Sequence, residues 1–246
     1  MTGRDAGIND NGRTLTKADW KRALLYYGAA SLIVIFGVAA AAVRFPGGFD
    51  WVYMVISKLG SRSHNPVGGL WLSASLLGAV CLLWPVTGLL DQGLARGSAR
   101  PLLSIAALRI GLIGAAVLAL EGLLTLELSR LARKGHEMVA LVTFLGLYGG
   151  VLGLYLQRIR HSVSFLWPAL LVVLPLCAVA ASQLVLYFDQ RDLGWVNTGW
   201  REMGVPFWLS FAFWQWLSVA FLGIGLGALV AVRNVIPQRN GARPRI

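Results

Sequence analysis

The chain has 246 residues, of which 57% are hydrophobic and 13% are charged, with a formal net charge of +11. Soluble domains carry roughly 25% charged residues, so the composition excludes an ordinary soluble protein. The basic residues lie in short segments between long apolar runs, which argues against a nucleic-acid partner and favours anionic lipid headgroups as the counter-charge.

Six long apolar runs predict transmembrane helices. Each has about 20 residues or more, which is enough to cross a hydrocarbon core of ~30 Å, and in lipid every backbone polar group must bond internally. We therefore predict an all-α, polytopic membrane bundle (23–232) between a polar N-terminal tail (1–22) and a basic C-terminal tail (233–246). The runs are at about 23–43, 68–90, 102–124, 136–156, 164–188 and 206–232.

The distribution of Lys and Arg predicts the orientation. Thirteen of these residues fall on the side of the two chain ends and eight on the opposite side, while Arg109 lies inside a span. Because cytoplasmic loops are enriched in Lys and Arg, we expect both ends in the cytoplasm, with the protein in a bacterial inner membrane.

The first outer segment, residues 44–67, is rich in polar and turn-forming residues. It holds Ser57, Ser61, His64 and Asn65. Asn65 stands before a proline, a pair that is typical of a helix start with the amide as the cap. Two interpretations stay open: a folded-back loop that plugs the outer end of the bundle, or a loop whose polar side chains contact a ligand.

Two ionisable residues lie near the outer ends of the third and fourth spans. Ionisable groups inside a membrane are costly, which makes Glu121 and His136 functional candidates. Because antiparallel helices joined by a short connection are neighbours, we expect these two side chains within reach of one another. Alternatively, Glu121 extends to the headgroups or pairs with Arg201, and His136 caps its helix.

Polar residues of the last two spans are expected at the same depth. Gln183 lies in the outer part of the fifth span, Arg201 precedes the sixth, and Gln215 lies ~14 Å into it at the helical rise. These groups and the first outer segment predict a polar pocket that opens outward. Its expected ligand-binding residues are Ser57, Ser61, Asn65, Gln183, Arg201 and Gln215.

The chemistry of such a pocket has several candidate forms. Glu121, His136 and His64 are the candidate catalytic residues for acid–base chemistry. The same three form a two-His, one-carboxylate set that zinc accepts, but no HExxH, HxH or CxxC spacing supports a metal. A serine nucleophile at Ser57 or Ser61 lacks a GxSxG motif, and the sequence identifies no cofactor.

Glycines indicate how the helices pack. The fourth span carries Gly146, Gly149, Gly150 and Gly153. Small residues at this spacing allow two helices to approach closely. We expect them to pack the bundle internally, with pairing to a second copy or to another membrane protein as the alternative.

The first outer segment also resembles a known group of proteins. Its residues 55–66 read Val-Ile-Ser-Lys-Leu-Gly-Ser-Arg-Ser-His-Asn-Pro. This stretch resembles the I-S-x-L-G-S…N-P signature of an uncharacterised family of six-helix bacterial membrane proteins, which is similar to the Frag/DRAM/Sfk-like membrane proteins. His136 at the start of the fourth span is a second point of resemblance, whereas the group often has Asp in place of Lys58. The resemblance implies the six-helix fold and a membrane location, and some eukaryotic relatives are linked to lipid organisation.

Together, these features predict a membrane protein whose outward-facing polar pocket binds or handles a lipid or a lipid-linked molecule. One alternative is an intramembrane hydrolase of lipid headgroups that uses Glu121 and His136 for acid–base chemistry. A second alternative is an accessory subunit that stabilises a larger membrane complex. The expected partners are membrane lipids, with a second copy or other membrane proteins as further candidates, and no nucleic acid.

Overall fold

The computed structural model describes residues 17–92, 99–126, 134–160, 162–191 and 198–231. Within these ranges the chain is helical and has no β-strand. Six helices are long and apolar enough to cross a membrane, so the chain is an integral, multi-pass membrane protein and the predicted all-α fold is confirmed. They are α1 (Lys17–Val43), α3 (Gly68–Gln92), α4 (Ala99–Leu124), α6 (Gly135–Ile159), α7 (Leu166–Arg191) and α9 (Phe211–Ala231).

The helices begin and end close to the expected bounds, with two differences. α1 begins at Lys17 rather than at residue 23, because polar residues continue the helix beyond the apolar run. The last span begins at Phe211 rather than at 206. Pro206 has an extended backbone and precedes a short 3-10 turn, η2 (Phe207–Leu209), which delays the start of α9. Residues 1–16 of the expected N-terminal tail and the whole tail 233–246 lie outside the described residues.

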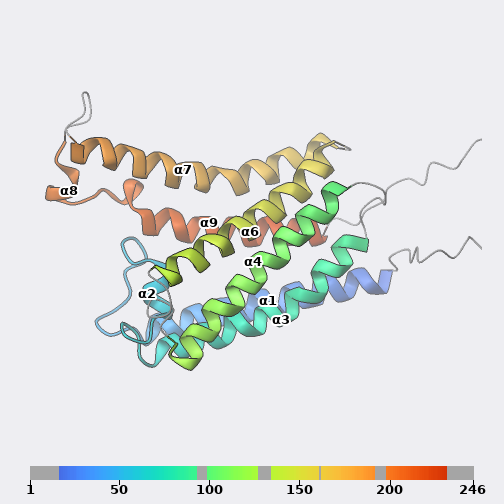
Figure 1. Ribbon diagram of the computed structural model, residues 1–246, viewed down its shortest axis with the longest axis horizontal. Helices are drawn as coiled ribbons and strands as arrows, with labels where there is room; N and C mark the ends of the chain where they lie inside the picture. Colours follow the sequence, from blue (N-terminus) through green and yellow to red (C-terminus); the bar gives the residue numbers. More distant parts are fainter. Residues whose placement is uncertain (1–16, 93–98, 127–133, 161, 192–197, 232–246) are drawn as a thin grey trace, which may run out of the picture.

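Consecutive spans pack side by side, and the last span closes the bundle. α1 contacts α3, α3 contacts α4, and α4 contacts α6, while α9 lies against both α1 and α6. α7 packs against α9 and α6, and η1 (Val163–Phe165) connects it to α6. Figure 1 shows the start of α1 and the end of α9 at one end of the bundle, with α2 (Ile56–Gly60) and α8 (Trp200–Met203) at the other. We call the end with α2 and α8 the outer end.

The outward faces of the spans are apolar. Leu25 and Leu32 of α1 and Leu103 of α4 are 68–69% exposed. In the most apolar window of each span, only 22–39% of the residues are buried within the chain. An apolar surface of this extent needs a lipid or protein neighbour, and the bilayer supplies it.

α4 and α6 approach each other closely because glycines line their contact. A Cβ added at Gly146 would lie 2.5 Å from the backbone nitrogen of Gly111, and a Cβ at Gly150 would lie 2.7 Å from the backbone nitrogen of Leu108. Any side chain at either position would therefore clash with the backbone of α4. Nothing lies within 4 Å of a Cβ at Gly149, which faces outward. The predicted internal packing is thus confirmed for Gly146 and Gly150, but not for Gly149.

Tyrosine hydroxyls fasten α9 to its neighbours. Tyr155 of α6 donates a hydrogen bond to the carbonyl oxygen of Gly225 at 2.7 Å, and Tyr27 of α1 donates to that of Gly223 at 2.7 Å. Tyr148, two turns before Tyr155, bonds to a further carbonyl of α9. A helix carbonyl has a second lone pair free to accept such a bond. These bonds satisfy the hydroxyls inside the membrane and hold α9 in register with α1 and α6.

Candidate functional site

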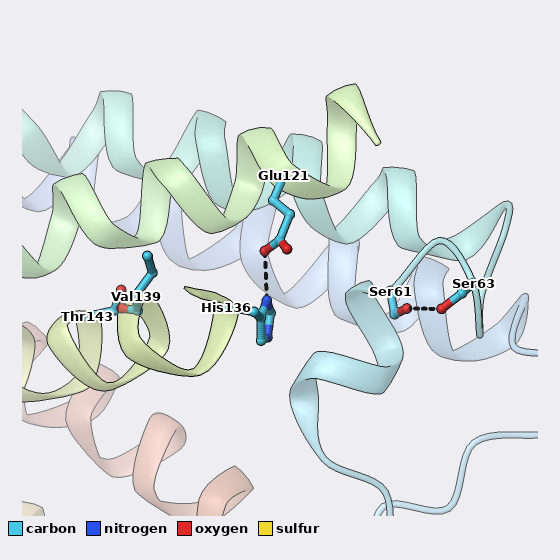
Figure 2. Close-up of polar contacts among 6 residues, drawn as sticks. All are labelled: Ser61, Ser63, Glu121, His136, Val139 and Thr143. Atoms are coloured by element: carbon cyan, nitrogen blue, oxygen red, sulfur yellow. Dashed lines mark hydrogen bonds and ion pairs between the residues drawn. The ribbon is translucent and has the colours of Figure 1, made fainter. Parts of the chain in front are cut away.

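Glu121 and His136 form a hydrogen-bonded pair at the outer end of α4 and α6. The distance from Nδ1 of His136 to Oε2 of Glu121 is 2.7 Å. Figure 2 shows the two side chains pointing toward one another from facing helices. The carboxylate side chain is 16% exposed and the imidazole 36% exposed, so the pair is accessible from the outer side. The prediction that these residues lie within reach of one another is confirmed.

The short connection between the two helices creates this geometry. α4 ends at Leu124, three residues after the glutamate, and α6 begins at Gly135, one residue before the histidine. Lys134 precedes α6 in the left-handed backbone region, with φ of 63°. The close glycine contact then keeps the two helices near enough for the side chains to meet.

An apolar groove of about 320 Å³ begins one turn below the pair. On α4, positions 114, 117 and 121 follow one another at intervals of three or four residues, so Gly114 and Val117 share one helix face with Glu121. On α6, Val139 lies one turn from His136 and is drawn beside it in Figure 2. The groove is lined by Ile110, Ile113, Gly114, Val117, Met138, Val139 and Val142.

The first outer segment folds back onto the bundle and is held there by Asn65. This side chain is fully buried. Its Nδ2 donates to the carbonyl oxygens of Ala41 and Leu59, each at 3.0 Å, and its Oδ1 accepts the backbone N–H of Gly68 at 3.0 Å. Asn65 thus joins α1, α2 and the start of α3, and its predicted role as a helix cap is confirmed. These bonds favour the plug interpretation for this residue.

The same segment is also bonded to the start of α9. Oε1 of Gln215 accepts the backbone N–H of Ile56 at 3.1 Å, and Nε1 of Trp216 donates to the carbonyl of Met54 at 3.0 Å. The hydroxyl of Tyr53 donates to the carbonyl of Val205 at 2.9 Å. Gln215 was expected to contact a ligand, but in the structure it positions α2.

The side chains of Ser61 and His64 lie in a turn of the loop and contact each other. The hydroxyl of Ser61 lies 2.7 Å from that of Ser63 and 3.2 Å from Nδ1 of His64. Ser57 is exposed on α2. In the described part of the chain, no three His, Cys, Asp or Glu side chains come close enough to hold a metal ion. The candidate set of His64, Glu121 and His136 is therefore not assembled, because the ring of His64 faces the two serines instead.

Of the two remaining candidates, Gln183 forms no bond with the Glu121–His136 pair, and the side chain of Arg201 cannot be placed. Nε2 of Gln183, on α7, is buried and has no hydrogen-bond partner among the described residues. Arg201 belongs to α8, and its side chain lies outside the described residues. Directly before α8, the Oδ1 of Asp189 accepts the backbone N–H of Thr198 at 2.8 Å and that of Gly199 at 3.1 Å. The polar residues expected in one pocket thus occupy several separate places at the outer end.

The apolar groove was not anticipated from the sequence. The spacing of Glu121 with Val117 and Gly114 contains the necessary information, because it places an apolar stripe below a carboxylate on one helix face. No family model, no curated protein and no solved structure matches the chain. The resemblance of residues 55–66 to a membrane-protein family therefore stays a prediction.

Proposed function

We propose that this membrane protein binds a lipid or a lipid-linked molecule at the outer end of the contact between α4 and α6. The tail occupies the apolar groove, and the headgroup lies beside Glu121 and His136. The observation that carries the proposal is the position of this polar pair at the end of an otherwise apolar groove. An amphiphile has the same division into a polar and an apolar part.

The length of the groove supports this assignment. From Ile110 to Glu121 the helical rise is about 16 Å. The hydrocarbon core of a bilayer is ~30 Å thick, so the groove together with the polar pair above it extends across about one leaflet. One lipid of the outer leaflet therefore fits with its headgroup at the level of the pair.

The proposal is tested by filling the groove. Val142→Trp places a large ring among the lining residues, whereas Leu145→Trp places the same ring on an outward position of α6 that is 63% exposed and lies outside the groove. We expect native mass spectrometry after gentle extraction to show bound lipid on the wild type and on L145W, with several-fold less on V142W. Equal lipid retention by both variants would refute the proposal.

Acid–base chemistry on the bound headgroup is a second candidate function. The bond to Glu121 orients the imidazole of His136, and among the described residues its Nε2 has no hydrogen-bond partner. A carboxylate that orients an imidazole is a recurrent arrangement for a general base. Under this hypothesis, E121Q and H136Q abolish headgroup turnover while lipid retention persists. Turnover in both variants would exclude this function and leave binding.

An accessory role in a larger complex has less structural support. The glycines of α6 that could contact another protein are already packed against α4, and Gly149 is the exposed exception. The excess of Lys and Arg at the end where α1 begins supports cytoplasmic termini and a bacterial inner membrane as part of the proposal.

A further inference from the structure

A compact polar cluster lies on the exposed turn that follows α2. The hydroxyls of Ser61 and Ser63 and Nδ1 of His64 lie within 2.7–3.2 Å of one another. The side chains of Ser63 and His64 are exposed, so these hydroxyls and the ring are accessible to a ligand from the outer side. Unlike Asn65, the cluster makes no side-chain bond to another helix among those described.

Two cationic residues lie next to this cluster in the sequence. Lys58 is exposed on α2, and Arg62 lies between the two serines with its Cδ against the start of α3 near Gly69. Neither side chain forms a hydrogen bond or an ion pair with any described residue. Residues 56–66 contain no carboxylate. On other elements, Glu121 of α4 is bonded to His136, and Glu137 is exposed in the first turn of α6.

The turn lies next to the outer end of α4, where Glu121 is located. A Cβ at Gly122 would lie 3.4 Å from the carbonyl oxygen of Gly60, so the end of α2 rests against the outer end of α4. Gly122 directly follows Glu121, and Ser61 directly follows Gly60. Figure 2 shows the serines and the Glu121–His136 pair at the same end of α4.

We propose that the headgroup recognised at this site ends in an unsubstituted phosphate, unlike the choline-esterified phosphate of phosphatidylcholine, and that this phosphate is bound by Lys58, Arg62 and the hydroxyls of Ser61 and Ser63. This inference rests on the proposed lipid-binding function and specifies its ligand class. Hydroxyls and cations, Arg above all, are the side chains that bind phosphate oxygens most strongly. The carboxylate–imidazole pair lies beside the phosphate, and the tail continues into the groove.

The test uses the full chain with an equal mixture of phosphatidic acid and phosphatidylcholine that have the same acyl chains. Bound lipid is counted by native mass spectrometry. We expect the wild type to retain phosphatidic acid over phosphatidylcholine by about tenfold, and K58Q/R62Q to reduce this preference to about twofold or less while phosphatidylcholine binding persists. The matched control is R44Q/R191Q, which removes two other outer cations that already lie over Trp71 and Tyr187. We expect this control to keep the tenfold preference, and thermal unfolding shows that both double variants are folded.

Each outcome separates this inference from the proposed function. An undiminished preference in K58Q/R62Q, or an equal loss in R44Q/R191Q, would overturn phosphate recognition by the turn and leave groove binding intact. If V142W loses both lipids, the groove holds the tail. If it retains phosphatidic acid at the wild-type level, the groove assignment fails and phosphate recognition stands.

Millimolar inorganic phosphate should not displace phosphatidic acid, because the buried tail adds ~0.8 kcal/mol per CH₂ to its binding. Full displacement would make free phosphate the ligand and overturn the lipid-borne source.

Discussion

Replacing Asn65 by alanine tests whether the first outer segment is held by this one buried side chain. The change removes three hydrogen bonds, to Ala41, Leu59 and Gly68, and leaves their backbone groups unpaired. At about 1 kcal/mol for each bond, we expect a loss of ~3 kcal/mol in the free energy of unfolding. For a domain of this size, 1 kcal/mol corresponds to roughly 2–4 °C, so the unfolding temperature should fall by about 6–12 °C.

The assay is thermal unfolding of the detergent-solubilised full chain, followed by tryptophan fluorescence. Ser57→Ala is the matched control, because Ser57 is exposed nearby on α2 and has no hydrogen-bond partner among the described residues. Asn65→Asp separates hydrogen bonding from volume: it keeps the acceptor for Gly68 but turns a carboxylate oxygen toward two carbonyls. We expect the aspartate variant to be at least as unstable as the alanine variant. An unfolding temperature of N65A within about 2 °C of the wild type would refute the reasoning.

Three further substitutions, two of them with a matched control, test the packing of the bundle and of the first outer segment. Gly146→Ala should cost about 1–3 kcal/mol, because its Cβ meets the backbone of α4, whereas Gly149→Ala should be neutral or stabilising by up to about 1 kcal/mol. Tyr155→Phe should lower the free energy of unfolding by about 1 kcal/mol through loss of its bond to α9, while Tyr187→Phe, at an exposed ring, should change it by less than about 0.5 kcal/mol. Gln215→Leu should accelerate limited proteolysis of the first outer segment by removing the acceptor for the first N–H of α2.

Comparison of each variant with its control, or with the wild type for Q215L, tests these predictions. Equal stabilities of G146A and G149A, measured by denaturant titration, would mean that α4 and α6 do not touch along their glycines. If Y155F and Y187F unfold alike, the hydroxyl bonds to α9 contribute nothing measurable. A wild-type cleavage rate in Q215L would show that the bond from Gln215 is not needed to hold the segment.

The sequence predicted the spans and the Glu121–His136 contact because strong, local constraints determine both. The thickness of the bilayer dictates the length of an apolar run, and a short connection between α4 and α6 leaves the two side chains few other positions. The cap formed by Asn65 could also be predicted from neighbouring residues, because Pro66 directly follows it and proline favours the first turn of a helix.

The rotation of each helix about its axis was harder to predict. α6 is apolar on nearly every side, so the sequence does not distinguish Gly146, which meets α4, from Gly149, which faces outward. The groove could not be predicted for the same reason, because it forms only where side chains of two helices leave a space between them. The bonds of Asn65 to α1 and α2 depend likewise on the path of the whole loop.

The bond between Tyr27 and Gly223 joins residues that are 196 positions apart, and so links the first span of the chain to the last. During synthesis α1 enters the membrane long before α9 exists, and until then the tyrosine hydroxyl faces lipid or solvent without this acceptor. The ring of contacts formed by α1, α3, α4, α6 and α9 closes only when the final span is inserted. A chain that lacks α9 would therefore leave an open seam between α1 and α6.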